Sequence, residues 1–149
     1  MLIKRIFFIV LFLNTLQLNF ARCQSVINKS DEVINKFFYY FQNKKYEIAL
    51  DSLYSNNLWL NVDSETNVEI IKQLKSLNNT ELFGKYCGYD LVKKEMIGES
   101  MVAYSYMVKF QRQPFRMIFI FYKPEKVWSI YSFIIDDKVD EELKERIKN

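Results

Sequence analysis

Apolar side chains recur every three or four positions through the first half of the chain, which is the spacing of amphipathic helices. A first helix is predicted to start at Ser30, whose hydroxyl can cap it. Its apolar positions form a wide, largely aromatic face: Val33, Ile34, Phe37, Phe38, Tyr40 and Phe41. A second helix starts at Tyr46, and a third at Thr66, which precedes Glu69 by the spacing of a capping box. The segment therefore predicts three N-terminal helices.

From Gly84 onward the period of the apolar positions shortens to two, and β-branched and aromatic residues become more frequent. Four strands separated by turns are predicted, over residues 86–94, 101–110, 115–122 and 127–135. The acidic tail from Asp136 opens a short C-terminal helix. Runs of helices and runs of strands segregate into layers. We therefore expect an α+β fold in which the three helices pack on a curved antiparallel sheet of about four strands.

The predicted strand over residues 115–122 is apolar on both of its faces. Phe119 and its alternate neighbours occupy one face, while Ile118 and Ile120 occupy the other. A sheet that faced water on one side would carry polar residues there, so both faces need a cover. The helices can cover one face. Curvature of the sheet, the C-terminal tail or a second subunit is needed for the other.

Residues 1–23 have the pattern of a cleavable signal peptide: Lys4 and Arg5, then a short apolar run, then a small-residue end. The apolar run is too short for a hydrocarbon layer of about 30 Å, and no later segment reads as a membrane span. We expect cleavage between Cys23 and Gln24, export to the periplasm or the medium, and one domain over residues 24–149. An alternative makes Cys23 a lipidated residue, but the bulky Arg22 before it departs from such sites.

Charge and cysteine content change after cleavage. The whole chain has a formal net charge of +3, but loss of the signal leaves 18 basic and 18 acidic residues. A neutral domain argues against nucleic-acid binding, which needs clustered cations. Only Cys87 remains, so no intramolecular disulfide can form. We expect a buried or partly buried, unreactive thiol at Cys87, and solvated carboxylates at Asp136 and the acidic residues after it.

A local pattern adds a resemblance to this interpretation. Residues 84–90 (GKYCGYD) are followed by residues 121–124 (FYKP) and by Trp128. With the order of elements over residues 31–137, the chain resembles the nuclear transport factor 2-like superfamily, and in particular a group of exported bacterial domains of that type. The resemblance implies a cone-shaped α+β fold, a pocket between sheet and helices, and dimers through the sheet in many members. Its enzymes often use a His and an Asp, and this chain has no histidine, so no catalytic residue is carried over.

Lack of histidine also removes the Ser-His-Asp and Cys-His arrangements, and one cysteine without histidine makes no zinc site. We therefore predict no catalytic residue, no metal and no cofactor. Arg116 lies on an otherwise apolar strand face, where it could bind a ligand carboxylate bidentately, pair with a structural acid or sit at an exposed strand end. Amphipathic aromatic side chains suit a pocket or an interface, although core packing also explains them. The candidate ligand-binding residues are Tyr104, Tyr106, Arg116, Tyr122, Trp128 and Tyr131.

These observations favour a non-enzymatic exported domain that binds a small apolar or amphipathic ligand, or a protein partner, through its aromatic sheet. One alternative is a hydrolase or isomerase that uses carboxylate and tyrosine chemistry without histidine. Another is a structural envelope protein that forms homodimers through an apolar sheet face containing Tyr106 and Phe119.

Overall fold

The computed structural model describes residues 29–55, 57, 59–60 and 64–148. The predicted signal peptide and its cleavage site, Cys23 and Gln24, lie outside the described residues. The chain divides into two compact units, residues 1–32 and 33–149. The described part of the smaller unit is a helical segment, residues 29–32; all contacts below belong to the larger unit. Among the described residues, no helix has the length and apolar character needed to cross a membrane.

Three helices and one additional turn precede the sheet. The N-terminal helix covers residues 29–42, and it is followed by α2 (Tyr46–Tyr54) and α3 (Glu65–Ser76). The predicted capping box is wrong, because the N-cap residue of α3 is Ser64 and Thr66 already lies inside the helix. The single turn α4 (Thr80–Phe83) was not predicted. It forms because Asn79 Oδ1 accepts hydrogen bonds from the backbone N–H groups of the next turn, at 3.0 and 3.2 Å.

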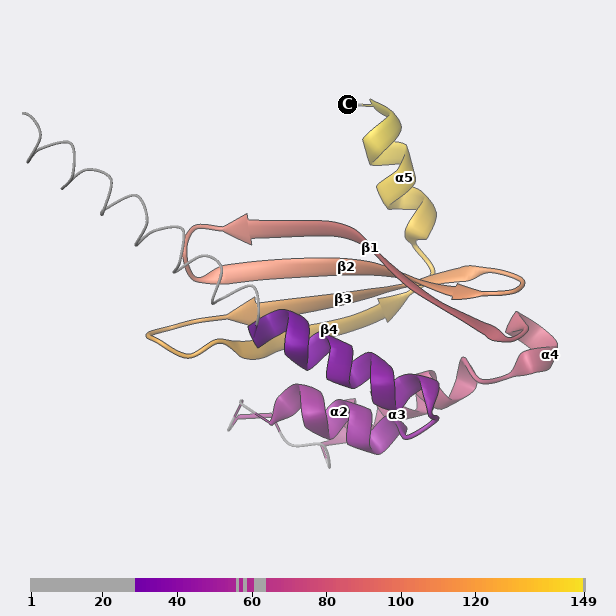
Figure 1. The fold of residues 1–149 in the computed structure, drawn as a ribbon, viewed down its shortest axis with the longest axis horizontal. Helices are drawn as coiled ribbons and strands as arrows, with labels where there is room; N and C mark the ends of the chain where they lie inside the picture. Colours follow the sequence, from indigo (N-terminus) through magenta and orange to yellow (C-terminus); the bar gives the residue numbers. More distant parts are fainter. Residues whose placement is uncertain (1–28, 56, 58, 61–63, 149) are drawn as a thin grey trace, which may run out of the picture. The chain divides into compact units, whose positions relative to one another are not determined.

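The four strands form one antiparallel sheet in sequence order, β1-β2-β3-β4 (Figure 1). They are β1 (Tyr86–Ile97), β2 (Met101–Phe110), β3 (Pro114–Tyr122) and β4 (Ser129–Asp136), and α5 (Val139–Lys148) follows. The predicted α+β class and the short C-terminal helix are confirmed. β1 is longer than predicted because its pairing with β2 continues to Ile97 opposite Met101, immediately before the turn.

The inner face of the sheet is an aromatic core covered by the helices. Phe119 pairs with Tyr104 on β2 and with Phe133 on β4, so these side chains share this face. Phe37 of the N-terminal helix packs against Phe119 and Phe133, with ring centroids 5.2 and 5.1 Å apart. Phe37, Tyr104 and Phe119 are fully buried. Each such ring contributes roughly 1.5–3 kcal/mol of burial free energy, so this face holds the helices to the sheet.

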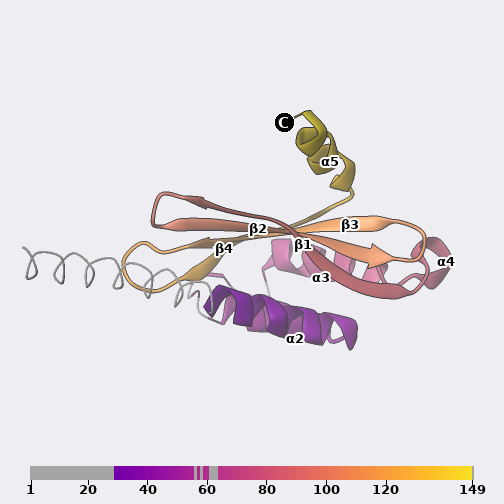
Figure 2. The same ribbon diagram turned by 45° about the horizontal axis from the view of Figure 1, so that its top comes forward.

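The outer face is only partly covered. Figure 2 shows α5 on the opposite side of the sheet from the N-terminal helices. Tyr122 and Ile134 of this face remain 39% and 40% exposed. The chain leaves the sheet after Asp136, so α5 contacts the sheet near that end of β3. In the part of the chain that the structure describes, the C-terminal helix α5 therefore covers the outer face of the sheet only near β3. Cover of the rest of that face by a second subunit stays a prediction.

Candidate functional site

The structure separates the six predicted site residues between the two faces of the sheet and the segment before β4, where Trp128 lies. Tyr104, Tyr106 and Trp128 are buried at 0%, 6% and 6% exposure. Tyr104 and Tyr106 pair with the inner-face residues of β3, whereas Arg116, Tyr122 and Tyr131 lie elsewhere. The six residues therefore do not form one site.

Tyr104 and Tyr106 pack as core residues. The Tyr106 ring lies 5.8 Å from that of Phe119, and the Tyr104 ring 5.9 Å from that of Phe121. The hydroxyl of Tyr104 and the indole N–H of Trp128 are buried and have no hydrogen-bond partner in the described part of the chain. Because helices cover this face, Tyr106 and Phe119 cannot supply a subunit interface, and that detail of the homodimer alternative is wrong.

Arg116 is occupied by a structural acid. Its Nε and Nη2 donate to the two carboxylate oxygens of Asp136, at 2.9 and 2.7 Å. Both side chains are largely buried, at 13% and 20% exposure. Burial alone would raise the pKa of Asp136, but the hydrogen bonds from Arg116 and from the Lys138 backbone N–H hold it below its usual value. The expected solvation of Asp136 is therefore wrong, and so is that of Glu142, whose side chain is 13% exposed. Arg116 has a structural acid as its partner, which was one of its three predicted alternatives.

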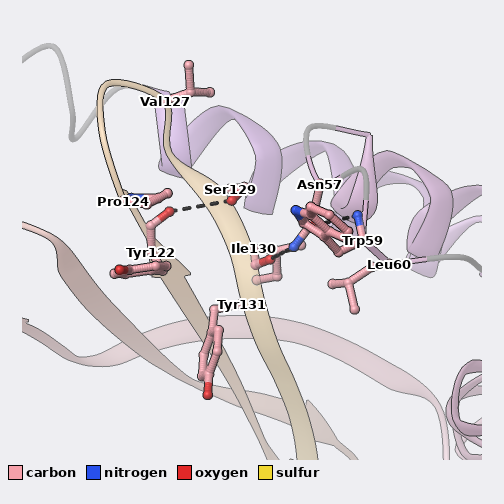
Figure 3. Close-up of a pocket in the computed structure, with 9 residues that line it drawn as sticks. All are labelled: Asn57, Trp59, Leu60, Tyr122, Pro124, Val127, Ser129, Ile130 and Tyr131. Atoms are coloured by element: carbon pink, nitrogen blue, oxygen red, sulfur yellow. Dashed lines mark hydrogen bonds between the residues drawn. The ribbon is translucent and has the colours of Figure 1, made fainter.

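The remaining predicted residues, Tyr122 and Tyr131, line an open pocket of about 520 Å³ at the edge strand β4 (Figure 3). The other lining residues come from the β3–β4 hairpin and from the segment after α2: Asn57, Trp59, Leu60, Pro124, Val127, Ser129 and Ile130. Figure 3 shows the two tyrosines on one side of β4, with Asn57 and Trp59 on the other. The pocket thus surrounds an exposed sheet edge.

A register irregularity positions Tyr131. Ile120 pairs with Ser132, but Phe121 pairs with Ile130, so Tyr131 has no partner on β3. The extra residue is a β-bulge, which redirects a side chain. The Tyr131 ring consequently lies 6.3 Å from the Tyr122 ring and stays 60% exposed.

Asn57 fixes the segment that carries Trp59. Its Nδ2 donates to the Ile130 carbonyl at 2.6 Å, while its Oδ1 accepts from the Trp59 backbone N–H at 2.9 Å. The Asn57 side chain therefore joins this segment to β4 by donating to a backbone carbonyl of that edge strand. The Trp59 side chain itself is 93% exposed. Sequence reasoning missed Trp59; the available signal was a large aromatic residue in the segment between two helices, flanked by asparagines and leucines.

The pocket chemistry is aromatic and uncharged. Its lining contains the hydroxyls of Tyr122, Ser129 and Tyr131 and the indole of Trp59, and none of the lining residues that the structure describes is charged. Neither this pocket nor the smaller described pocket beside the N-terminal helix is lined by a carboxylate. In these two pockets the described residues offer no acid–base pair of the kind that a histidine-free hydrolase needs.

Other reactive groups lie away from this pocket. Cys87 is exposed, so the expected buried thiol is wrong; edge strand β1 has no neighbouring strand on one side to cover it. Its Sγ lies 3.3 Å from the Lys85 carbonyl oxygen. The residues that the structure describes contain no group of three or more His, Cys, Asp or Glu arranged to hold a metal ion.

Comparisons with known proteins give no relative: no protein-family model, curated protein or solved structure matches the chain.

Proposed function

We propose that this protein is an exported, non-enzymatic binding domain that holds an apolar or amphipathic ring of its ligand in the pocket at β4. The observation that carries the proposal is the exposure of three aromatic side chains that line one open pocket. Trp59, Tyr131 and Tyr122 are 93%, 60% and 39% exposed, and all three line the same pocket.

The size and composition of the pocket support this function. Ligand sites commonly enclose about 300–1,000 Å³ and combine apolar walls with a few polar groups, and this pocket of about 520 Å³ falls in that range. Tyrosine and tryptophan offer a large rigid contact area together with a hydroxyl or N–H for orientation. An uncharged lining favours a neutral ligand over an ionic one.

The test is a fluorescence titration with N-phenylnaphthylamine, a neutral apolar dye whose emission rises on binding. Trp59→Ala and Tyr131→Ala should each weaken binding about fivefold, the ratio expected from loss of one aromatic contact. Tyr39→Ala is the matched control, because Tyr39 is also 60% exposed and does not line the pocket.

The chain contains two tryptophans, and Trp128 is buried. In a Trp128→Phe background, Trp59 becomes the sole indole reporter, and its emission should change as the dye binds. Absence of dye binding to the wild type, or an equal loss in Tyr39→Ala, would refute the proposal.

Export and membership of the nuclear transport factor 2-like superfamily stay predictions; the order of helices, sheet and C-terminal helix supports the second. A homodimer is the second candidate function, and the partly uncovered outer face favours it. Ile134, which is 40% exposed there, is the residue to change. If the face joins two copies, Ile134→Asp should convert dimers to monomers in light scattering after size exclusion.

A further inference from the structure

A second pocket, of about 160 Å³, lies where the N-terminal helix ends, beside the starts of α2 and β1. Its apolar wall consists of Phe41, Tyr46, Leu77 and Phe110. The volume is close to that of an engineered 150 Å³ cavity that binds benzene. The wall therefore offers space for one aromatic ring or a branched aliphatic group of similar size.

Two lysines line the same pocket, and none of its described lining residues is acidic. Lys44 follows the N-terminal helix, and Lys85 directly precedes β1. Neither forms an ion pair with a residue that the structure describes. Their ammonium groups are thus available to an external anion. The other polar lining residues are uncharged side chains that can donate hydrogen bonds: Gln42, Asn78, Thr80 and Tyr86.

Lys44 occupies a backbone conformation that favours glycine. Its φ is +60°. Among the residues that the structure describes, every other residue with positive φ is a glycine. Two backbone bonds close the helix end: Lys44 N–H donates to the Phe41 carbonyl at 2.9 Å, and Lys45 N–H to that of Tyr40 at 3.0 Å. The Asn43 side chain adds a third bond, from its Nδ2 to the Tyr39 carbonyl at 2.7 Å. Glycine is the usual residue at the position that Lys44 occupies in such a Schellman-type helix end. Lysine at this position adds a positive charge beside the helix C-terminus, which glycine cannot supply.

Tyr86 supplies an unused hydrogen-bond donor. Its hydroxyl is buried and has no partner among the described residues. Burial, with a smaller contribution from Tyr89, raises the pKa of Tyr86 to about 12. The hydroxyl therefore keeps its proton at neutral pH. A buried donor without a partner is costly to the fold alone, and a bound oxygen acceptor would satisfy it.

We infer that this pocket binds a small monocarboxylate with a compact apolar body, whose carboxylate is held by Lys44, Lys85 and the Tyr86 hydroxyl while the body packs against Phe41 and Phe110. The apolar wall favours a ligand body of about one ring, and the two ammonium groups favour a ligand that carries a negative charge. The ligand class differs from the neutral class proposed for the pocket at β4, so the two proposals fail independently.

The experiment is a calorimetric titration of the full mature chain with benzoate at low ionic strength, with benzamide as the neutral analogue of the same shape. Benzoate should bind, added salt should weaken it, and benzamide should bind at least about tenfold more weakly, the ratio for one charge-assisted hydrogen bond. Inorganic phosphate, which lacks the apolar body, should also bind more weakly than benzoate.

The variant Lys44→Gly separates binding from folding. It removes one ammonium group and relieves the backbone, so Tm should rise while benzoate affinity falls about tenfold. Lys45→Gln is the matched control: it removes the adjacent charge, and Lys45 does not line the pocket. Tyr86→Phe should also lower the affinity without lowering Tm.

Three results would each overturn the inference. These are no benzoate binding, equal affinity for benzoate and either benzamide or phosphate, and unchanged affinity in Lys44→Gly.

Discussion

The ion pair between Arg116 and Asp136 allows a sharp test of what fixes the end of the sheet. The change is Asp136→Asn, which keeps the shape of the side chain and removes its charge. Of the two oxygens that now accept from Arg116 Nε and Nη2 at 2.9 and 2.7 Å, one would become an amide nitrogen, which donates and cannot accept. The Lys138 backbone N–H, which donates to Asp136 Oδ1 at 3.0 Å, depends on the same side chain.

The magnitude follows from the burial of the pair. Exposed ion pairs contribute about 0–1 kcal/mol, and loss of one partner of a buried pair costs about 3–5 kcal/mol. Arg116 and Asp136 lie between these limits, with side chains 13% and 20% exposed. Glu142 lies 3.9 Å from Arg116 Nη1 and retains part of the attraction. We therefore expect Asp136→Asn to lower the free energy of unfolding by about 2 kcal/mol at pH 7.

The effect has a defined pH dependence. The pKa of Asp136 in the folded protein lies below its usual value, which is about 3.9 in an unfolded chain. A group with a depressed pKa stabilises the fold above the unfolded pKa, and this contribution is lost as pH falls through the folded pKa. The stability difference between wild type and Asp136→Asn should thus be complete at neutral pH and shrink below about pH 4.

Urea denaturation followed by circular dichroism, repeated at a series of pH values, measures this difference. Asp137→Asn is the control, because Asp137 is exposed and its change should matter by less than about 0.5 kcal/mol. The reasoning fails if Asp136→Asn has no cost at neutral pH, or if the cost persists undiminished in acid.

Two further predictions concern strain and buried hydroxyls, and chemical denaturation measures both. A Cβ at Gly84, where φ is +77°, would lie 2.6 Å from Gln111 Cβ, whereas one at Gly98, with φ +60°, meets nothing within 4 Å. Gly84→Ala should therefore cost about 2–4 kcal/mol and Gly98→Ala about 1 kcal/mol, and equal costs would contradict this reasoning. The buried Tyr54 hydroxyl donates to Asn67 Oδ1 at 2.9 Å, whereas that of Tyr104 has no partner among the described residues. Tyr54→Phe should cost about 1 kcal/mol and Tyr104→Phe nothing, so the reverse order would argue against the assigned hydroxyl environments.

The periodicity of the apolar residues predicted most of the fold. β2 has the bounds that the sequence predicts, Met101–Phe110, because strict alternation fixes which side chains face the core. The turn α4 was missed because two consecutive asparagines indicated only the end of α3, while Asn79 also caps the turn that follows. Local sequence identifies a polar residue at a boundary but not which neighbouring segment it bonds.

The candidate site was less predictable, for a geometric reason. Composition identifies amphipathic aromatic residues, but alternation assigns Tyr104 to the inner face and Tyr122 to the outer one. The side on which Tyr131 lies is set by a β-bulge, which interrupts the alternation of period two. The sequence carries no clear pattern that predicts this bulge. Trp59 reaches the pocket through a long-range bond from Asn57 to Ile130, and no local pattern encodes such a contact.

The consecutive order of the strands has a consequence for how the domain folds. Residues 98–100 and 111–113 connect β1 to β2 and β2 to β3, and such short connections lose little chain entropy on closure. Hairpins of this kind form rapidly compared with contacts between distant segments. Phe37, in contrast, must find Phe119 and Phe133 far along the chain. Docking of the N-terminal helix is therefore the step expected to limit folding, and until it occurs the newly formed sheet exposes its aromatic inner face to other chains.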